Sequence, residues 1–379
     1  MFRDRNVLLF SAAIILALSG QGFVVPFLPV YARQLGASYF EVGMLFAALE
    51  IAWALAVLPL GLLADRFGRK YFACAGFALL SLTPVAYALS RHPWQLIGFR
   101  CLQGISEALN FTIGTAYVAG MARKKGQAIG AYHSLANLGF ALTPIPAGLL
   151  IDFLGIKKTF LIGAAVMGMG FLASLPAERD EPSNDQTRSV HFIKNRLVYL
   201  LSVLAVFPAL TVGFCNAFLQ VFFYELVPSE RVVGFTITIY FVSYSLAVLL
   251  AGHLTDSLGW RRPLLLGLFG SGVSFAALAL AQDVIRAGVS VGFLGLAQAL
   301  ASVPFTVRLA ELFPGETAGS LSVLTVFRMA ALAGGASLGG MLSQLTGLRP
   351  AFLLYGGIMF LGGALLVLMK KYTEYTGQK

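Results

Sequence analysis

Long apolar runs separated by short polar or charged segments dominate the chain. Twelve of these runs are long enough to cross a bilayer as a helix, which takes about 20 predominantly apolar residues. The expected spans are 7–31, 39–63, 71–90, 93–120, 126–152, 157–176, 197–224, 232–254, 263–281, 285–312, 317–345 and 350–370. The first run has one alternative reading, a signal peptide with Val7–Leu18 as its apolar core, but it continues through Val30 without a clear small-residue cleavage site. The pattern predicts an all-helical integral membrane protein.

The composition excludes a soluble globular fold. Hydrophobic residues make up 58% of the chain and charged residues 12%, against roughly 45–50% and about 25% in soluble domains. The three cysteines fall inside apolar runs, so we expect neither a disulfide framework nor a metal site. There is no P-loop and no metal-binding motif, and no nucleophile, base and orienting group occur together. We therefore expect a non-enzymatic protein that needs no cofactor and draws energy for any uphill transport from an ion gradient or an exchanged solute.

The positive charges are distributed unevenly between the two sets of loops. One set carries 17 Lys and Arg residues and the opposite set carries seven. Since positively charged loops remain in the cytoplasm, both termini are predicted to be cytoplasmic and the protein to be a multi-pass component of the plasma (inner) membrane. The net charge of +10 is then a topology signal and implies no nucleic-acid partner.

A single clearly polar stretch, residues 177–196, divides the spans six and six. We expect it to be a cytoplasmic linker between an N-terminal bundle, 1–176, and a C-terminal bundle, 197–379. The halves repeat each other, because Gly61, Asp65 and Gly68 recur 191 residues later as Gly252, Asp256 and Gly259 (252 − 61, 256 − 65, 259 − 68). A second match, Gly126 and Gly130 with Gly315 and Gly319, has an offset of 189 (315 − 126, 319 − 130). Six helices duplicated in parallel orientation are one architecture for alternating access.

The sequence motifs resemble the major facilitator superfamily over essentially the whole chain. GLLADRFGRK, Gly61–Lys70, is similar to the family's signature between helices 2 and 3, and GHLTDSLGWRR from Gly252 is similar to its weaker copy between helices 8 and 9. Arg100, Gln103 and Gly104 match the family's RxxQG pattern in span 4, and AELFP, Ala310–Pro314, resembles the usual end of helix 10. The resemblance implies two pseudo-symmetric six-helix bundles and is closest to the 12-helix drug/proton antiporter-like exporters.

Two features depart from that subgroup. Span 5 carries Gly139, Pro144 and Gly148 of the family's GxxxGPxxGG exporter motif, but Thr143 and Ala147 replace two of its glycines. Span 1 has no acidic residue, only Gln21, whereas many proton-coupled drug exporters of the family have one. Both departures count against a standard antiporter mechanism.

The loop motif suggests a cytoplasmic gate. Gly61 and Gly68 would bracket a tight turn, and Asp65 would accept backbone N–H bonds from a neighbouring helix start. By the resemblance that start is helix 11, just after Pro314 and Gly315. Asp65 and the basic residues Arg66, Arg69 and Lys70 would then hold the cytoplasmic side closed in one state, as a latch. The second copy of the motif consists of Gly252, Asp256 and Gly259. Alternatively, the basic residues only anchor the topology.

Four charges stand out within the predicted spans because they lie away from the span ends, namely Glu50, Arg100, Glu107 and Arg328. Each costs roughly 2.5–3.5 kcal/mol or more at the bilayer centre unless it is paired or hydrated, so these side chains should face the central path. Arg100 and Glu107 are seven residues apart on one helix face, and Glu107 is the preferred proton-coupling site. The alternative is a static pair of Arg100 with Glu107 or Glu50 that only holds helices together.

Uncharged polar residues of the spans form a pool of candidates for the substrate path, although each is as often an interhelical hydrogen bond. They are Gln21, Gln103, Asn110, His133, Asn137, Asn216, Gln220, Tyr240, Tyr244 and Gln298.

The sequence as a whole predicts a secondary transporter of small molecules that works as a monomer in the lipid bilayer by proton-coupled efflux of partly lipophilic compounds. A sugar or organic-acid importer or facilitator of the same fold is the first alternative. A non-transporting membrane receptor is a remote one.

Overall fold

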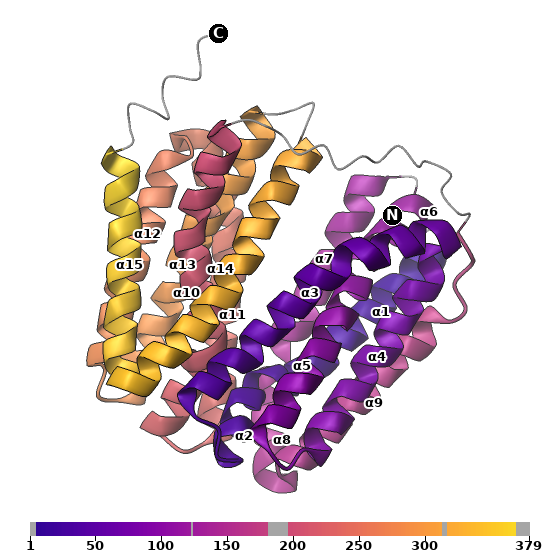
Figure 1. Cartoon of the computed structure of the whole chain (residues 1–379), viewed down its shortest axis with the longest axis horizontal. Coiled ribbons are helices and arrows are strands. Elements are labelled where there is room, and N and C mark those ends of the chain that lie inside the picture. The colour runs from indigo at the N-terminus through magenta and orange to yellow at the C-terminus, as the bar shows by residue number, and fades with distance from the viewer. Residues whose placement is uncertain (1–4, 123, 181–195, 313–316, 369–379) are drawn as a thin grey trace. The chain divides into compact units, whose positions relative to one another are not determined.

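The computed structural model describes residues 5–122, 124–180, 196–312 and 317–368. All regular elements in these ranges are helical (Figure 1). In chain order they are α1 (Arg5–Gly22), η1 (Val25–Phe27), α2 (Leu28–Gln34), α3 (Tyr39–Phe67), α4 (Arg69–Leu89), α5 (Pro93–Glu107), η2 (Ala108–Ile113), α6 (Gly114–Met121), α7 (Lys125–Leu142), α8 (Pro144–Leu154), α9 (Ile156–Ser174), α10 (Arg196–Leu226), α11 (Glu230–Leu258), α12 (Arg261–Leu280), α13 (Val284–Leu312), α14 (Thr317–Thr346) and α15 (Leu348–Leu368).

These helices confirm the all-helical membrane fold expected from the sequence. Among the described residues, eleven helical segments are long and apolar enough to cross a membrane. The fourth expected span is not one of them, although it forms an unbroken helix from Pro93 to Met121 through α5, η2 and α6. It carries the buried polar residues Arg100, Gln103, Glu107 and Asn110, which lower its hydropathy.

Proline and a π-helical turn interrupt three of the spans. Pro26 and Pro29 are the second residues of η1 and α2, and Pro144 begins α8 directly after Thr143, the C-cap of α7. In the fourth span the helix widens into the π-helical turn η2 immediately after Glu107. Such turns occur frequently at functional sites.

The duplication is visible in the helix bounds. The segment Glu230–Leu258 lies 191 residues after Tyr39–Phe67 (230 − 39, 258 − 67), and Val284–Leu312 lies 191 residues after Pro93–Met121 (284 − 93, 312 − 121). The fifth and eleventh spans end at Leu154 and Thr346, which are 192 residues apart (346 − 154), whereas the glycine match with its offset of 189 falls partly on Gly315, outside the described residues. The offset changes by only one residue (192 − 191), so the two halves are nearly collinear.

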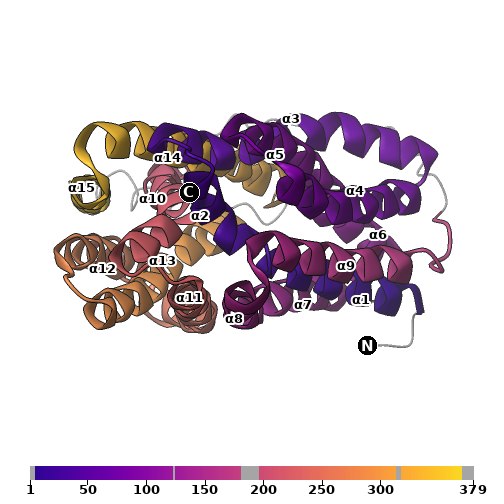
Figure 2. The ribbon, with the colours of Figure 1, turned by 90° about the horizontal axis from the view of Figure 1, so that it is seen from below.

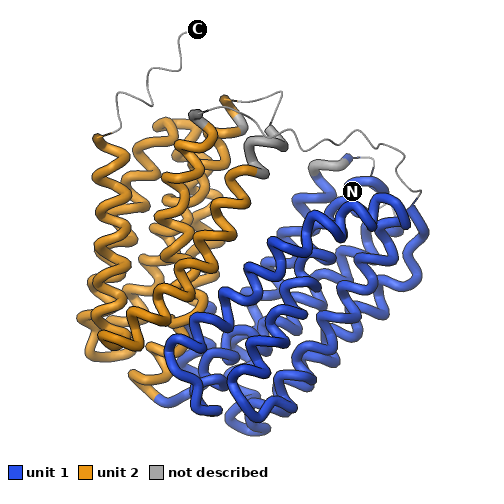
Figure 3. Tube along the Cα trace, viewed as in Figure 1, with its two compact units in different colours: residues 1–189, 228–238 blue, residues 190–227, 239–379 orange. Residues whose placement is uncertain are grey.

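The helices form two compact units, coloured separately in Figure 3. The first comprises Met1–Ser189 with Pro228–Thr238, and the second Val190–Val227 with Ile239–Lys379. In the first unit α1 packs against α7 and α9, and α4 against α5 and α9 (Figure 2). In the second unit α10 packs against α14, while α12 packs against α13 and α15. The same pairings recur in both units, as a duplicated bundle requires.

The unit boundaries differ from the expected 1–176 and 197–379 at two places. The start of α11 belongs to the first unit, where Arg231 forms an ion pair with Asp152 of α8. Ala177–Asp180, expected in the linker, also pack on the first unit, because Asn6 and Glu178 exchange two hydrogen bonds of 3.0 Å. Most of the remaining linker, residues 181–195, lies outside the described residues.

Each loop motif makes a tighter turn than expected. Gly61 and Gly252 lie inside α3 and α11, so they do not bracket the turn. A single residue with positive φ separates the helices, Gly68 at 99° in the first unit and Gly259 at 77° in the second. Only glycine adopts this backbone region without strain, which explains the recurrence of Gly68 and Gly259.

Candidate functional site

Glu107 lies at the centre of its span. It is the middle residue of the helix Pro93–Met121, with fourteen residues on either side (107 − 93, 121 − 107). The helix is roughly 43 Å long at 1.5 Å per residue and the hydrocarbon core is about 30 Å thick. The carboxylate is therefore held at mid-membrane depth, where only 5% of the residue is exposed.

Two side-chain amides hold one oxygen of this carboxylate. Gln21 of α1 donates from Nε2 to Oε1 across 2.5 Å, and Gln103 donates from Nε2 to the same oxygen across 3.4 Å. The second oxygen, Oε2, is buried and has no hydrogen-bond partner among the described residues. A buried carboxyl oxygen without a donor is the position at which a proton is best accommodated, because a carboxylic acid carries its own hydrogen there.

Arg100 is linked to this carboxylate through Gln103. Its guanidinium donates to Gln103 Oε1 at 2.9 Å and to the backbone oxygen of Leu45 at 3.3 Å, and it lies over the ring of Phe46 at 4.5 Å. Arg100 is 2% exposed and forms no ion pair with a described residue. The static pair of Arg100 with Glu107 or Glu50 is therefore not formed in this structure. Glu50 lies half-buried in α3.

The second unit repeats this polar centre without a carboxylate. Gln298 lies 191 residues after Glu107 (298 − 107) and is the middle residue of α13. The hydroxyl of Tyr240 donates to Gln298 Oε1, and Gln298 Nε2 approaches Thr211 Oγ1 at 3.4 Å and Cys215 Sγ at 3.7 Å. The duplication has thus kept a buried amide in one half and a titratable acid in the other.

The other predicted path residues have their own surroundings within each unit. His133 contacts the Thr115 hydroxyl at 3.1 Å, and Asn110 donates to Ser106 at 3.3 Å. Asn137 is exposed on α7, Asn216 is half-buried and Gln220 is buried in α10. Among the described residues, no hydrogen bond joins any of these five to the carboxylate.

The loop motif of the first unit is held by two carboxylates. Asp65 pairs with Arg69 one turn later at 2.7 Å, while Asp180 accepts the backbone N–H groups of Arg69 and Lys70 at 2.9 and 3.0 Å. The carboxylate at the start of α4 is thus Asp180, which the sequence placed in the linker. The expected partner of Asp65, just after Pro314 and Gly315, lies outside the described residues. Arg66 lies over the ring of Phe67 at 5.4 Å.

The second copy of the motif has a different arrangement. Asp256 lies in the last turn of α11, and Arg261 beyond Gly259 donates to the backbone oxygen of Leu366 at 2.8 Å. This bond ties the start of α12 to α15 within the second unit.

The glycines of the helix 5 motif allow close helix contacts inside the first unit. A Cβ added to Gly139 would lie 2.6 Å from the backbone oxygen of Ile15 in α1. A Cβ added to Gly148 would lie 2.6 Å from the backbone oxygen of Glu230, and one on Gly234 would lie 2.3 Å from that of Pro144. Gly148 and Gly234 therefore permit backbone contact between α8 and the start of α11.

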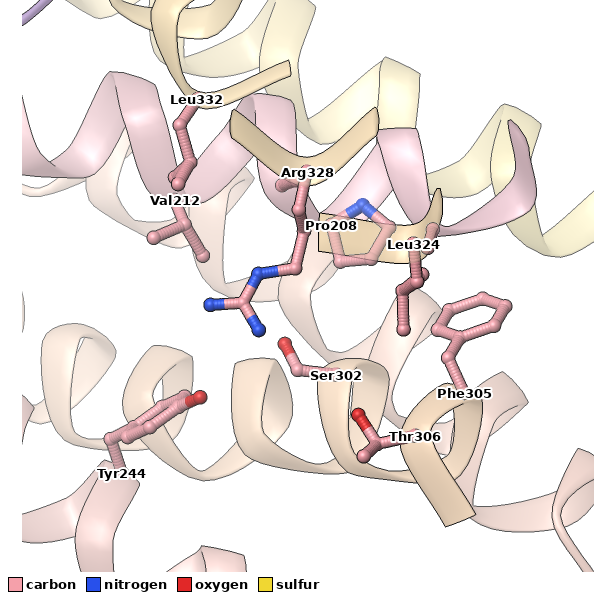
Figure 4. Close-up of a pocket in the computed structure, with 11 residues that line it drawn as sticks. Pro208, Val212, Tyr244, Ser302, Phe305, Thr306, Leu324, Arg328 and Leu332 are labelled. Atoms are coloured by element: carbon pink, nitrogen blue, oxygen red, sulfur yellow. The ribbon is translucent and has the colours of Figure 1, made fainter. Parts of the chain in front are cut away.

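Arg328 of α14 lines a recess in the second unit together with Tyr244 of α11 and Ser302 of α13 (Figure 4). The cavity volume is about 50 Å³, which suits a few water molecules or one small polar group and not a drug-sized molecule.

Sequence reasoning missed several members of these clusters. Tyr87, whose hydroxyl donates to Gln103 at 2.7 Å, and Thr211 lie in apolar runs where single hydroxyls give no functional signal. Asp180 was not distinguished from its charged neighbours. Thr211 lies 190 residues after Gln21 (211 − 21), close to the offset of the repeat, and this correspondence could have indicated a polar position in the second unit.

Comparison with known proteins identifies the family of this chain. The sequence profile of the Major Facilitator Superfamily matches residues 10–236 and 201–379. The chain belongs to this superfamily. Multidrug resistance protein 2 of Bacillus subtilis is 26% identical over 385 residues, covering 94% of this chain and 93% of the relative. Multidrug resistance protein MdtG of Escherichia coli is 25% identical over 374 residues, covering 94% and 92%.

The fold matches solved structures at lower identity. A bacterial homologue of the human lysosomal transporter Spinster, in an inward-facing and occupied conformation, superimposes with a TM-score of 0.85 at 15% identity, over 98% of this chain and 97% of that one. The protein is accordingly a multi-pass membrane transporter of small molecules, from a family that is not enzymatic.

Proposed function

We propose that this transporter is a proton-coupled exporter of partly lipophilic small molecules, with Glu107 as the proton-binding group. The arrangement of Glu107 carries the proposal, because a mid-membrane carboxylate has two amide donors on one oxygen and a buried second oxygen without a donor. Intramembrane carboxyl groups are rare and costly, and in pumps and transporters they form proton relays.

Coupling between proton and substrate would depend on whether Arg100 bonds to Gln103 or to Glu107. With Glu107 protonated, Arg100 remains bonded to Gln103 as observed. When the proton leaves, the ionised carboxylate attracts the guanidinium, since a charged pair at this depth is stronger than a bond to a neutral amide. Gln103 would then be released toward the substrate path. Proton binding and substrate binding would thus compete for the same polar network, and such competition produces antiport.

Three further features complete the proposal. Asp65, Arg69 and the turn at Gly68 form a cytoplasmic gate, both termini are cytoplasmic, and the monomer is the working unit. The direction and cargo are suggested by the relatives, whose names record multidrug resistance. The 31 Phe and 13 Tyr residues suit lipophilic cargo.

Everted membrane vesicles energised to be acid inside test this function. Addition of dyes, antibiotics, sugars or organic acids should release protons only for the cargo class, and Glu107→Gln should abolish the release at equal protein level. Glu311→Gln is the matched control, because this exposed carboxylate lies at the end of α13 and pairs with Arg308 of the same helix. Failure of every compound to release protons from wild-type vesicles would contradict export by proton exchange and favour import or facilitated diffusion.

A further inference from the structure

The second unit contains an arginine near mid-membrane depth that pairs with no acidic residue among the described residues of its own unit. Arg328 lies three residues before Ala331, at the centre of α14, which corresponds to about 5 Å along the helix axis. The described acidic residues of this unit all lie at helix ends or just outside them, namely Glu225, Asp256, Asp283 and Glu311. The cost of keeping a guanidinium at this depth calls for a functional explanation.

The surroundings of Arg328 provide hydrogen-bond donors and apolar surface. Figure 4 shows the guanidinium extending from α14 into the recess toward Ser302, with the hydroxyls of Tyr244 and Thr306 below it on either side. No acidic residue lines the recess, and its remaining walls are mostly apolar, including Pro208, Val212 and Phe305.

The three hydroxyl groups of the recess differ in whether they can donate a hydrogen bond to a bound ligand. Ser302 donates its hydroxyl to the backbone oxygen of Gln298 at 2.8 Å, so that hydrogen is already used within α13. Neither Thr306 nor Tyr244 uses its hydroxyl in a hydrogen bond to a described residue. The recess therefore presents one guanidinium and two available hydroxyl donors, a set that binds an anionic acceptor more strongly than a neutral one.

We infer that this recess binds the anionic group of the cargo, a carboxylate or a group of similar size, while the apolar remainder of the molecule lies outside it. This inference deepens the proposed function and rests on it for the direction and energy of transport. The cavity of about 50 Å³ admits a carboxylate but not an aromatic ring beside it. The planar guanidinium can hold both oxygens of the carboxylate at once. The substrate class is therefore amphipathic organic anions.

A binding experiment on the purified protein in detergent tests this without any gradient. The probes are radiolabelled phenylalkanoates of increasing chain length, each with its neutral amide as the matched compound. Wild type should bind the best acid at least about tenfold more tightly than its amide, the size expected for one charge-assisted bidentate contact. Arg328→Gln should bind acid and amide equally, whereas Arg328→Lys should retain part of the preference.

Two neighbouring hydroxyls provide a control that does not depend on the arginine. Thr306→Val should weaken binding of the acid several-fold, while Ser302→Ala should leave it unchanged because its hydroxyl is donated to Gln298. This pair keeps the test decisive even if Arg328→Gln does not fold.

Two results would overturn the inference. The first is a wild-type protein without preference for any acid over its amide, including no binding of either. The second is retention of the full acid preference in folded Arg328→Gln, which would show that another group of the protein recognises the anion. Glu107→Gln should keep the acid preference while losing proton release, so failure of the anion site and failure of proton coupling are separately visible.

Discussion

Gln21 and Glu107, from two different helices of the first unit, meet near mid-membrane depth, where Gln21 Nε2 donates to Glu107 Oε1 across 2.5 Å. Both residues are 5% exposed. Many proton-coupled exporters of this family carry an acid in the first span, but here an amide from that span supports an acid in the fourth. In this chain the acid of the buried polar centre lies on the fourth span, and the first span contributes an amide.

Replacement of Gln21 by leucine should destabilise the protein. The buried carboxyl group would lose its shortest hydrogen bond, at a cost of about 1–3 kcal/mol. Thermal unfolding in detergent should show a lower midpoint for Gln21→Leu than for the control Gln220→Leu, since the buried Oε1 of Gln220 has no partner among the described residues. Equal midpoints for the two variants would mean that the contact with Glu107 contributes nothing to stability.

Lysine at position 100 should fold but transport poorly. Arg100 bonds to Gln103 and to the Leu45 backbone while lying over Phe46, and a lysine ammonium lacks the planar fork that makes these contacts together. Initial transport rates should fall about tenfold or more, the effect of losing one charge-assisted bond. Arg286→Lys, at an exposed position beside Asp283, is the control. Wild-type rates for Arg100→Lys would argue that position 100 requires only a positive charge.

Asp180 should stabilise the start of α4. Its carboxylate accepts the Arg69 and Lys70 backbone N–H groups, so Asp180→Ala should cost about 1 kcal/mol. Hydrogen exchange of a peptide that spans these two amides should become faster in Asp180→Ala and remain near wild type in Asp180→Asn, which keeps an acceptor oxygen. Unchanged exchange in the alanine variant would contradict the cap.

Enlargement of Gly148 should separate α8 from the start of α11. A Cβ at this position would lie 2.6 Å from the Glu230 backbone oxygen, whereas one on Gly168 in α9 would meet nothing within 4 Å. Gly148→Val should therefore lower both the amount of folded protein and the transport rate, and Gly168→Val should change neither beyond the small cost of a branched residue in a helix. Similar behaviour of the two variants would mean that this contact has no role.

The sequence was sufficient to predict the architecture but not the pairing of the polar groups. Hydropathy located the spans because a bilayer imposes helix length, and the repeat of Gly61, Asp65 and Gly68 revealed the duplication. The seven-residue spacing placed Arg100 and Glu107 on one face of a helix, but whether they pair depends on Gln103, which lies between them and bonds to both.

Contacts between distant segments were beyond sequence reasoning. Asp180 caps a helix that starts 111 residues earlier in the chain, and its charge alone suggests only solvation. Arg328 was recognisable as an intramembrane charge, yet the recess around it is formed by side chains from four helices, and Ser302 differs from Thr306 only in a local hydrogen bond. The contacts of such residues become known only from the three-dimensional structure, because a single hydroxyl in an apolar run has no distinctive periodicity.

The central claim is that Glu107 binds the exchanged proton, and proton release by the purified protein tests it most directly. Saturating cargo added to the unbuffered protein in detergent, with a pH indicator, should release up to about one proton per wild-type molecule and none from Glu107→Gln, although the variant still binds the cargo. Undiminished proton release from a folded Glu107→Gln protein would contradict the account and place the coupling proton on another group.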